Sequence, residues 1–245
     1  HLPNKIEFNE FTTKLKEARA IPEQMQKNMK NWRKNAHPMD VLQAFVAALA
    51  GYYDEQGTEK EISQQRAINL ISKVPTIIAS WERVRNDKEP IQPDPELSHA
   101  SNFLYMLTGN KPDKEMERVF DVCLILHADH TFNASTFAAR EVASTRAHMY
   151  SAVSAAVGAL SGELHGGANY EVMKMLLDIK DENNATNWVK SRIEKGDRIM
   201  GMGHAVYKTV DPRSMVLKEL SKNLSAKTGL PWYNITKKVE ETTSE

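Results

Sequence analysis

Apolar residues recur three and four positions apart along almost the whole chain, and this helical period is the feature that most limits the possible folds. The longest helical run extends from Glu59 to Arg85, and Pro75 is expected to kink or divide it. Further helices are predicted from Glu96 to Leu107 and from Pro112 to His127. Because no segment alternates apolar and polar residues as a half-buried strand does, the sequence predicts an all-α fold.

A row of small side chains follows the segment 135–159. Its members stand four residues apart: Ser135, Ala139, Ala143, Ala147, Ser151, Ala155 and Ala159. Each step of four advances about 40° past a full turn, so the row winds around the helix, and more than one neighbour must approach closely. We predict one long helix packed inside a helical core. An interface between the subunits of a homodimer is a second possibility for the same segment.

Charge and composition exclude several classes of protein. The 32 Lys and Arg residues balance 32 Asp and Glu residues, so the chain as a whole has no field that attracts nucleic acid or an anionic membrane. No apolar run approaches the roughly 20 residues that span a bilayer, and the first residues contain no signal-peptide core. The single Cys123 has no disulfide partner and is expected to be a buried apolar residue. These features favour a cytoplasmic protein that does not bind nucleic acid or membranes.

Histidines point to the region that carries function. Five of the eight fall between positions 127 and 204, and three of those lie in short glycine-rich or polar segments: His130, His165 and His204. Imidazole is the side chain whose ordinary pKa is closest to neutrality, so this grouping indicates a site that moves protons and binds anions.

Arg213 stands beside the last of these histidines. Asp211 followed by Pro212 predicts the start of a helix, which puts Arg213 in the first turn. A cation there opposes the helix dipole, so a structural purpose is hard to supply, whereas an anionic ligand would remove the conflict. A side chain that is simply solvated is the alternative.

His165 lies among glycines that permit a sharp turn, with Asn169 predicted to cap the next helix. The positive end of that helix favours a neutral imidazole that donates a hydrogen bond. A solvated histidine in a turn is the alternative.

His127, Asp129 and His130 form a candidate metal site, since two imidazoles and a carboxylate can ligate zinc. The chain contains no HExxH motif and no further acidic ligand placed near them, so we expect no metal. His127 is expected to cap the C-terminal end of its helix.

The segments HADHTFNASTFAAR, SGELHGGAN and GMGHAVYKTVDPR, in this order, resemble the three histidine segments of the family that comprises citrate synthase and 2-methylcitrate synthase. The resemblance implies a homodimer with a large helical domain at 1–167 and a small domain at 168–245. It also implies condensation of acetyl-CoA with oxaloacetate to give citrate and CoA. No bound cofactor is expected, and the coenzyme A thioester is a co-substrate.

Residue roles follow from the same resemblance. His165 matches the histidine that hydrogen-bonds the thioester carbonyl of acetyl-CoA, and His204 matches the one that polarises the carbonyl of oxaloacetate. His130 and Arg213 match ligands of oxaloacetate, and Lys208 matches a basic residue near the phosphates of coenzyme A.

The resemblance also implies segments that this sequence lacks at both ends, including the catalytic aspartate that follows the region where it stops. The large domain would then lack its N-terminal part, the small domain would be incomplete, and the 245 residues alone would turn over little or not at all. Three alternatives stay open: a 2-methylcitrate synthase that uses propionyl-CoA, a catalytically inactive helical interaction protein, and a metal-dependent hydrolase.

Overall fold

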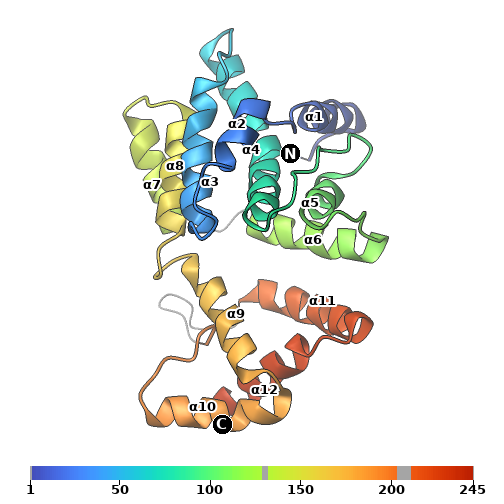
Figure 1. Ribbon diagram of the computed structural model, residues 1–245, viewed down its shortest axis with the longest axis vertical. Coiled ribbons are helices and arrows are strands. Elements are labelled where there is room, and N and C mark those ends of the chain that lie inside the picture. Colours follow the sequence, from blue (N-terminus) through green and yellow to red (C-terminus); the bar gives the residue numbers. More distant parts are fainter. Residues whose placement is uncertain (1, 129–131, 203–210, 245) are drawn as a thin grey trace. The chain divides into compact units, whose positions relative to one another are not determined.

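The computed structural model describes residues 2–128, 132–202 and 211–244 (Figure 1). All regular elements in these ranges are helices, so the predicted all-α fold is confirmed. They are α1 (Lys5–Glu17), α2 (Glu23–Met29), α3 (Pro38–Ala48), the 3₁₀ turn η1 (Leu49–Gly51), α4 (Glu59–Arg85), α5 (His99–Thr108), α6 (Lys114–His127), α7 (Ala134–Ser144), α8 (Met149–Leu160), α9 (Gly167–Ile179), α10 (Glu182–Glu194), α11 (Pro212–Thr228) and α12 (Trp232–Ser244). In the part of the chain that the structure describes, no helix is both long and apolar enough to cross a bilayer.

Local sequence explains where many of these helices begin and end. The Thr58 side chain accepts a hydrogen bond from the Glu61 N–H while Glu61 reaches back to the Thr58 N–H, and this capping box starts α4 at the predicted residue. Pro75 lies inside α4 without dividing it, so of the two expected effects, a kink or a division, the division does not occur. Gly109 ends α5 in the left-handed conformation, with φ of 90°. At the end of α6, Nδ1 of His127 donates to the carbonyl of Cys123 at 2.6 Å, as expected for a C-terminal cap.

The segment 135–159 does not form the single long helix that we predicted. It forms α7 and α8, which pack against each other, and Arg146 between them has a positive φ of 64°. The row of small residues therefore lies on two antiparallel neighbours, where small side chains allow close approach of the two backbones. A sequence period of four residues cannot reveal such a reversal, because the period continues across the connection.

Contacts divide the chain into two compact units, His1–Ser161 and Gly162–Glu245, which we call the N-terminal and C-terminal units. Each has its own buried apolar cluster. The domain boundary between 167 and 168 rests on the resemblance and stays a prediction.

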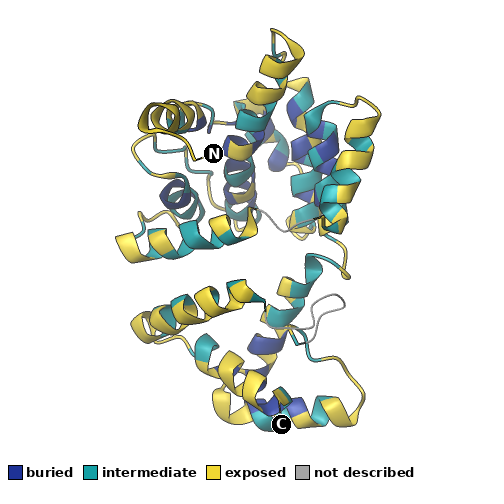
Figure 2. Ribbon diagram, turned by 180° about the vertical axis from the view of Figure 1, so that it is seen from behind, coloured by how far each residue is buried: buried dark blue, intermediate teal, exposed yellow. Residues whose placement is uncertain are grey.

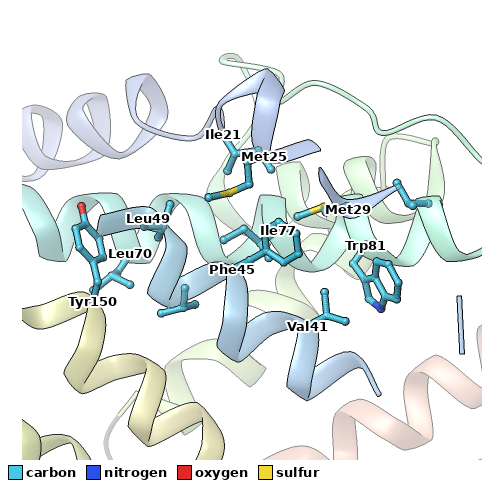
Figure 3. Close-up of a cluster of buried hydrophobic side chains, with 12 residues drawn as sticks. Ile21, Met25, Met29, Val41, Phe45, Leu49, Leu70, Ile77, Trp81 and Tyr150 are labelled. Atoms are coloured by element: carbon cyan, nitrogen blue, oxygen red, sulfur yellow. The ribbon is translucent and has the colours of Figure 1, made fainter. Parts of the chain in front are cut away.

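The core of the N-terminal unit forms where α2, α3 and α8 pack on α4 (Figure 3). Figure 3 shows α4 passing the cluster from Leu70 to Trp81, with Tyr150 of α8 at one end. The Tyr150 hydroxyl donates to Glu55 at 2.5 Å and accepts from the Asn69 amide at 3.0 Å, so its polar atom is paired at the edge of the core.

Helix α1 is tied to α4 through the carbonyls that follow its last turn. The buried Lys73 ammonium donates to the carbonyl of Ala18, and the Thr76 hydroxyl donates to that of Arg19 at 2.8 Å. The Arg19 guanidinium in turn donates to the carbonyl of Asp94 at 2.9 Å. Three buried side chains thus hold the connection between α1 and α2 in place.

The C-terminal unit is built on α9, α10 and α12. Their facing residues form its core: Met175, Leu176, Ile179, Ala185, Val189, Ile235 and Val239. Helix α11 packs on α12 and has no buried residue, and Figure 2 shows it in exposed and intermediate colours along its length. The predicted site residues that the structure describes, His165 and Arg213, belong to this unit.

Candidate active site

His165 lies half-buried in the turn that leads into α9. Its backbone N–H donates to the carbonyl of Gly162 at 2.9 Å, and the N–H of Gly167 donates to the same oxygen at 3.2 Å. The turn is therefore closed by its own backbone, and it presents the His165 side chain directly before the N-terminus of the helix. This placement agrees with the prediction.

Two details of this turn differ from expectation. Helix α9 begins at Gly167, so Asn169 lies in its first turn and does not cap it. Gly166 is the capping residue, and its φ of −72° is open to any residue. The conformation of Gly166 thus gives no reason for glycine, and the sharp turn comes from the shared carbonyl of Gly162.

Glycine is required further along, at Gly201. Its φ of 83° is left-handed, and a Cβ added there would lie 3.2 Å from Cγ2 of Val172 on α9. Neighbouring Ile199, Met200 and Met202 pack against the core of the C-terminal unit. The segment that leads toward His204 is therefore anchored on α9, the helix that follows His165.

Arg213 stands in the first turn of α11, as predicted, with Asp211 as the capping residue. The Asp211 carboxylate accepts from the backbone N–H of Arg213 at 2.9 Å. It also accepts from the guanidinium: Nε lies 3.0 Å from Oδ1, and Nη2 lies 2.6 Å from Oδ2. The prediction that a structural purpose is hard to supply for Arg213 is wrong, because the capping carboxylate offsets the unfavourable dipole.

The pairing of Asp211 with Arg213 is what sequence reasoning missed. The sequence predicts a helix cap at Asp211 and no ion pair with Arg213. The available signal was the spacing, because a capping carboxylate and a side chain two residues later both lie beside the first turn of a helix.

Three predicted site residues, His130, His204 and Lys208, lie outside the described residues. Their roles stay predictions. His127, which precedes His130 by three residues, donates a hydrogen bond to the carbonyl of Cys123. Within 2–128, 132–202 and 211–244, no group of three or more His, Cys, Asp or Glu side chains is placed to hold a metal ion.

Comparisons with known proteins agree over the whole chain. A family model described as citrate synthase, C-terminal domain, matches residues 1–245. The chain is 42% identical over 246 residues to a citrate synthase of Synechocystis sp., covering 100% of this chain and 62% of the relative. It is 39% identical over 231 residues to a citrate/2-methylcitrate synthase of Bacillus subtilis, covering 93% of this chain and 62% of the relative.

A solved structure is similar in fold and sequence. It is the citrate synthase of Thermoplasma acidophilum in ternary complex with carboxymethyl coenzyme A and oxaloacetate. The TM-score is 0.90 and the identity is 31%, and the match covers 98% of this chain and 64% of that chain. This chain thus spans less than two thirds of the length of the relatives that it matches.

Proposed function

This chain belongs to the citrate synthase family, and from this premise we propose that the protein condenses acetyl-CoA with oxaloacetate to give citrate and free CoA. The observation that carries the proposal is the match to the family over all 245 residues, with the histidine segments in order. The similar structure from Thermoplasma acidophilum, which was solved with a coenzyme A analogue and oxaloacetate, supports the same pair of substrates.

The reaction develops negative charge on two carbonyl oxygens. A base removes a proton from the methyl group of acetyl-CoA, and the electron pair moves toward the thioester oxygen. The enol carbon then bonds to the keto carbon of oxaloacetate, whose oxygen takes up a proton. Water finally cleaves the thioester and releases citrate and the CoA thiol. Each carbonyl oxygen therefore needs a hydrogen-bond donor placed in advance.

We assign these donors by the family motif. His165 donates to the thioester oxygen and His204 to the keto oxygen, while His130 and Arg213 bind the carboxylates of oxaloacetate. Lys208 binds the phosphates of coenzyme A. For His165 and Arg213 the geometry supports the assignment, since the first lies immediately before the N-terminus of α9 and the second within the first turn of α11.

We assign no described residue as the base that removes the methyl proton. Asp211 is unsuited to that role because its carboxylate caps α11 and pairs with Arg213. A carboxylate held by a guanidinium is a weaker base than one without a cationic partner.

The experiment that tests the proposal follows thiol release from acetyl-CoA with and without oxaloacetate, with citrate identified by mass spectrometry. We expect that whatever release occurs depends on oxaloacetate and is unaffected by a chelator, and that oxaloacetate binds. Thioester cleavage without oxaloacetate that a chelator abolishes would support the metal-dependent hydrolase. Absence of release together with no binding of oxaloacetate would support the non-enzymatic interaction protein.

The second candidate function is that of a 2-methylcitrate synthase that uses propionyl-CoA, because a relative at 39% identity is named citrate/2-methylcitrate synthase. The two substrates differ by one methylene, and a pocket fitted to one of them discriminates against the other by about 1 to 3 kcal/mol. We propose acetyl-CoA as the preferred substrate, and the ratio of kcat/KM for the two thioesters decides it.

Three further parts of the proposal continue the expectations from the sequence: a homodimer through the segment 135–159, a cytoplasmic location, and no bound cofactor besides the thioester co-substrate. For the dimer, the surface in question belongs to α7 and α8 and not to one long helix. The molar mass in solution tests it.

A further inference from the structure

One carboxylate performs two tasks at the start of α11. Oδ1 of Asp211 accepts from the backbone N–H of Arg213 at 2.9 Å, which caps the helix. The same carboxylate binds the Arg213 guanidinium along the edge formed by Nε and Nη2, at 3.0 Å from Nε to Oδ1 and 2.6 Å from Nη2 to Oδ2. The helix cap and the two-point ion pair, which we call the fork, therefore share one carboxylate.

The arrangement fixes the direction of the arginine. Arg213 is attached to the first turn of α11, and its guanidinium is bound to a residue of the same turn. Both side chains are 27% exposed, so this ion pair is better shielded from water than an ordinary surface pair. A guanidinium is planar and carries five N–H donors, of which those on Nε and Nη2 face Asp211 here. Binding of Nε and Nη2 to Asp211 therefore sets the plane in which the remaining donors lie.

We propose that Asp211 is a positioning residue that orients Arg213 toward a carboxylate of oxaloacetate. This inference rests on the proposed function and deepens it. An arginine without such a partner samples many rotamers and must be ordered when the substrate binds, which weakens binding. With Asp211 in place, much of that ordering is complete before the substrate arrives.

The negative charge of Asp211 affects oxaloacetate binding in the opposite direction from its positioning role, so the sign of the change tests the proposal. A carboxylate near a dianionic substrate repels it and offsets the charge of Arg213. If Asp211 acted only through its charge, its removal would strengthen the binding of oxaloacetate. If it orients Arg213, its removal weakens binding. The two roles predict changes of opposite sign.

The variant Asp211→Asn separates the fork from the cap. Asparagine caps helices as well as aspartate does, and its amide oxygen can still accept the Arg213 N–H. Its amide NH₂ faces a guanidinium N–H instead of accepting from it, so the fork is lost. In the full chain we expect KM and Kd for oxaloacetate to rise about 2- to 10-fold. The kcat should change by less than about 2-fold, and KM for acetyl-CoA should stay the same.

A matched control exists at the start of α10. Asp181 also caps its helix by accepting from the backbone N–H two residues later, at 2.9 Å to Asn183. Asp181→Asn therefore makes the same chemical change at a cap of the same unit and should leave KM for oxaloacetate unchanged. Equal melting temperatures for the two variants show that the cap at α11 is intact.

A double-mutant cycle tests whether Asp211 acts through Arg213. Arg213→Lys removes the planar fork and keeps the charge. In that background, Asp211→Asn should produce no further increase in KM. Equal increases with and without Arg213 would overturn the positioning role.

Failure of this inference is distinguishable from failure of the proposed function. If the wild-type protein neither binds oxaloacetate nor releases CoA with it, the proposed function is wrong. If the wild-type protein does both and Asp211→Asn binds oxaloacetate as well as or better than wild type, only the positioning role is wrong.

Discussion

Under the proposed function, His165 is the hydrogen-bond donor to the thioester, and the structure defines its local backbone. The turn around it is closed by hydrogen bonds to the carbonyl of Gly162, and α9 begins two residues later at Gly167. A neutral imidazole can donate one hydrogen bond to a carbonyl oxygen. The local backbone thus suits the role that the family motif assigns.

The first prediction concerns His165→Ala. Loss of a donor that stabilises a developing oxyanion lowers kcat by about 10²- to 10³-fold. Oxaloacetate binding, measured by calorimetry, should be retained, because the proposed role of His165 is on the thioester. Steady-state thiol release measures the first quantity.

His37→Asn is the control for this variant. His37 is exposed and caps α3 by accepting from the N–H of Met39 at 3.3 Å, and asparagine keeps that function. We expect its kcat to equal that of the wild type. A His165→Ala protein with wild-type kcat would remove His165 from the mechanism.

Arg213 shows what the sequence can indicate about one residue and what it cannot. Its place in the first turn of a helix followed from Asp211 and Pro212. Its partner did not, since the rotamer that brings the guanidinium onto the capping carboxylate is one of many that the same sequence permits.

At the scale of the elements, the buried Lys73 that links α1 to α4 is expected to make the free energy of unfolding depend on pH. Lys73 is 3% exposed, its ammonium lies 4.8 Å from the centre of the Tyr53 ring, and burial lowers its pKa to about 8. An unfolded lysine keeps its proton up to about pH 10.4. Between these values the unfolded chain binds more protons than the folded one, so stability rises with pH.

The second prediction uses Lys73→Met, which removes the titrating group and keeps an apolar stem. From pH 8 to 10, the free energy of unfolding of the wild type should rise relative to that of the variant by up to about 1.4 kcal/mol per pH unit. Urea denaturation at each pH measures the difference.

Thr76→Val is the control, because it removes the neighbouring hydrogen bond to Arg19 without removing a titratable group. Its destabilisation should be the same at every pH. A constant difference between the wild type and Lys73→Met would contradict the shifted pKa.

Helices α7 and α8 show the limit of periodicity at this scale. The small residues repeat every four positions through the segment 135–159, yet the chain reverses near Arg146. No proline or glycine marks the reversal, and the positive φ of Arg146 is uncommon for such a residue. Packing of α8 against α3 and α7 decides it.

At the scale of the whole molecule, the chain has two separate apolar cores, one in each unit. Ile235 is fully buried among residues of the C-terminal unit, and Met29 is fully buried in the N-terminal unit. The two clusters share no residue. Local stability within one chain then varies by region.

The third prediction is that Ile235→Ala destabilises the C-terminal unit by about 2 to 5 kcal/mol, through lost burial and a cavity. Hydrogen exchange should lose protection in α9, α10 and α12 and keep it in α3 and α4. Met29→Ala should give the reverse pattern. A uniform loss of protection along the chain in both variants would show a single cooperative unit.

The sequence by itself determined the helical class, the three histidine segments and their order, and the start of α11 at Asp211 and Pro212. These features depend on residue types a few positions apart, where spacing and capping chemistry act directly. Only the tertiary structure decided the reversal between α7 and α8, the burial of Lys73 and the approach of Gly201 to Val172. Those depend on which surfaces meet, since burial and close approach are set by distant neighbours.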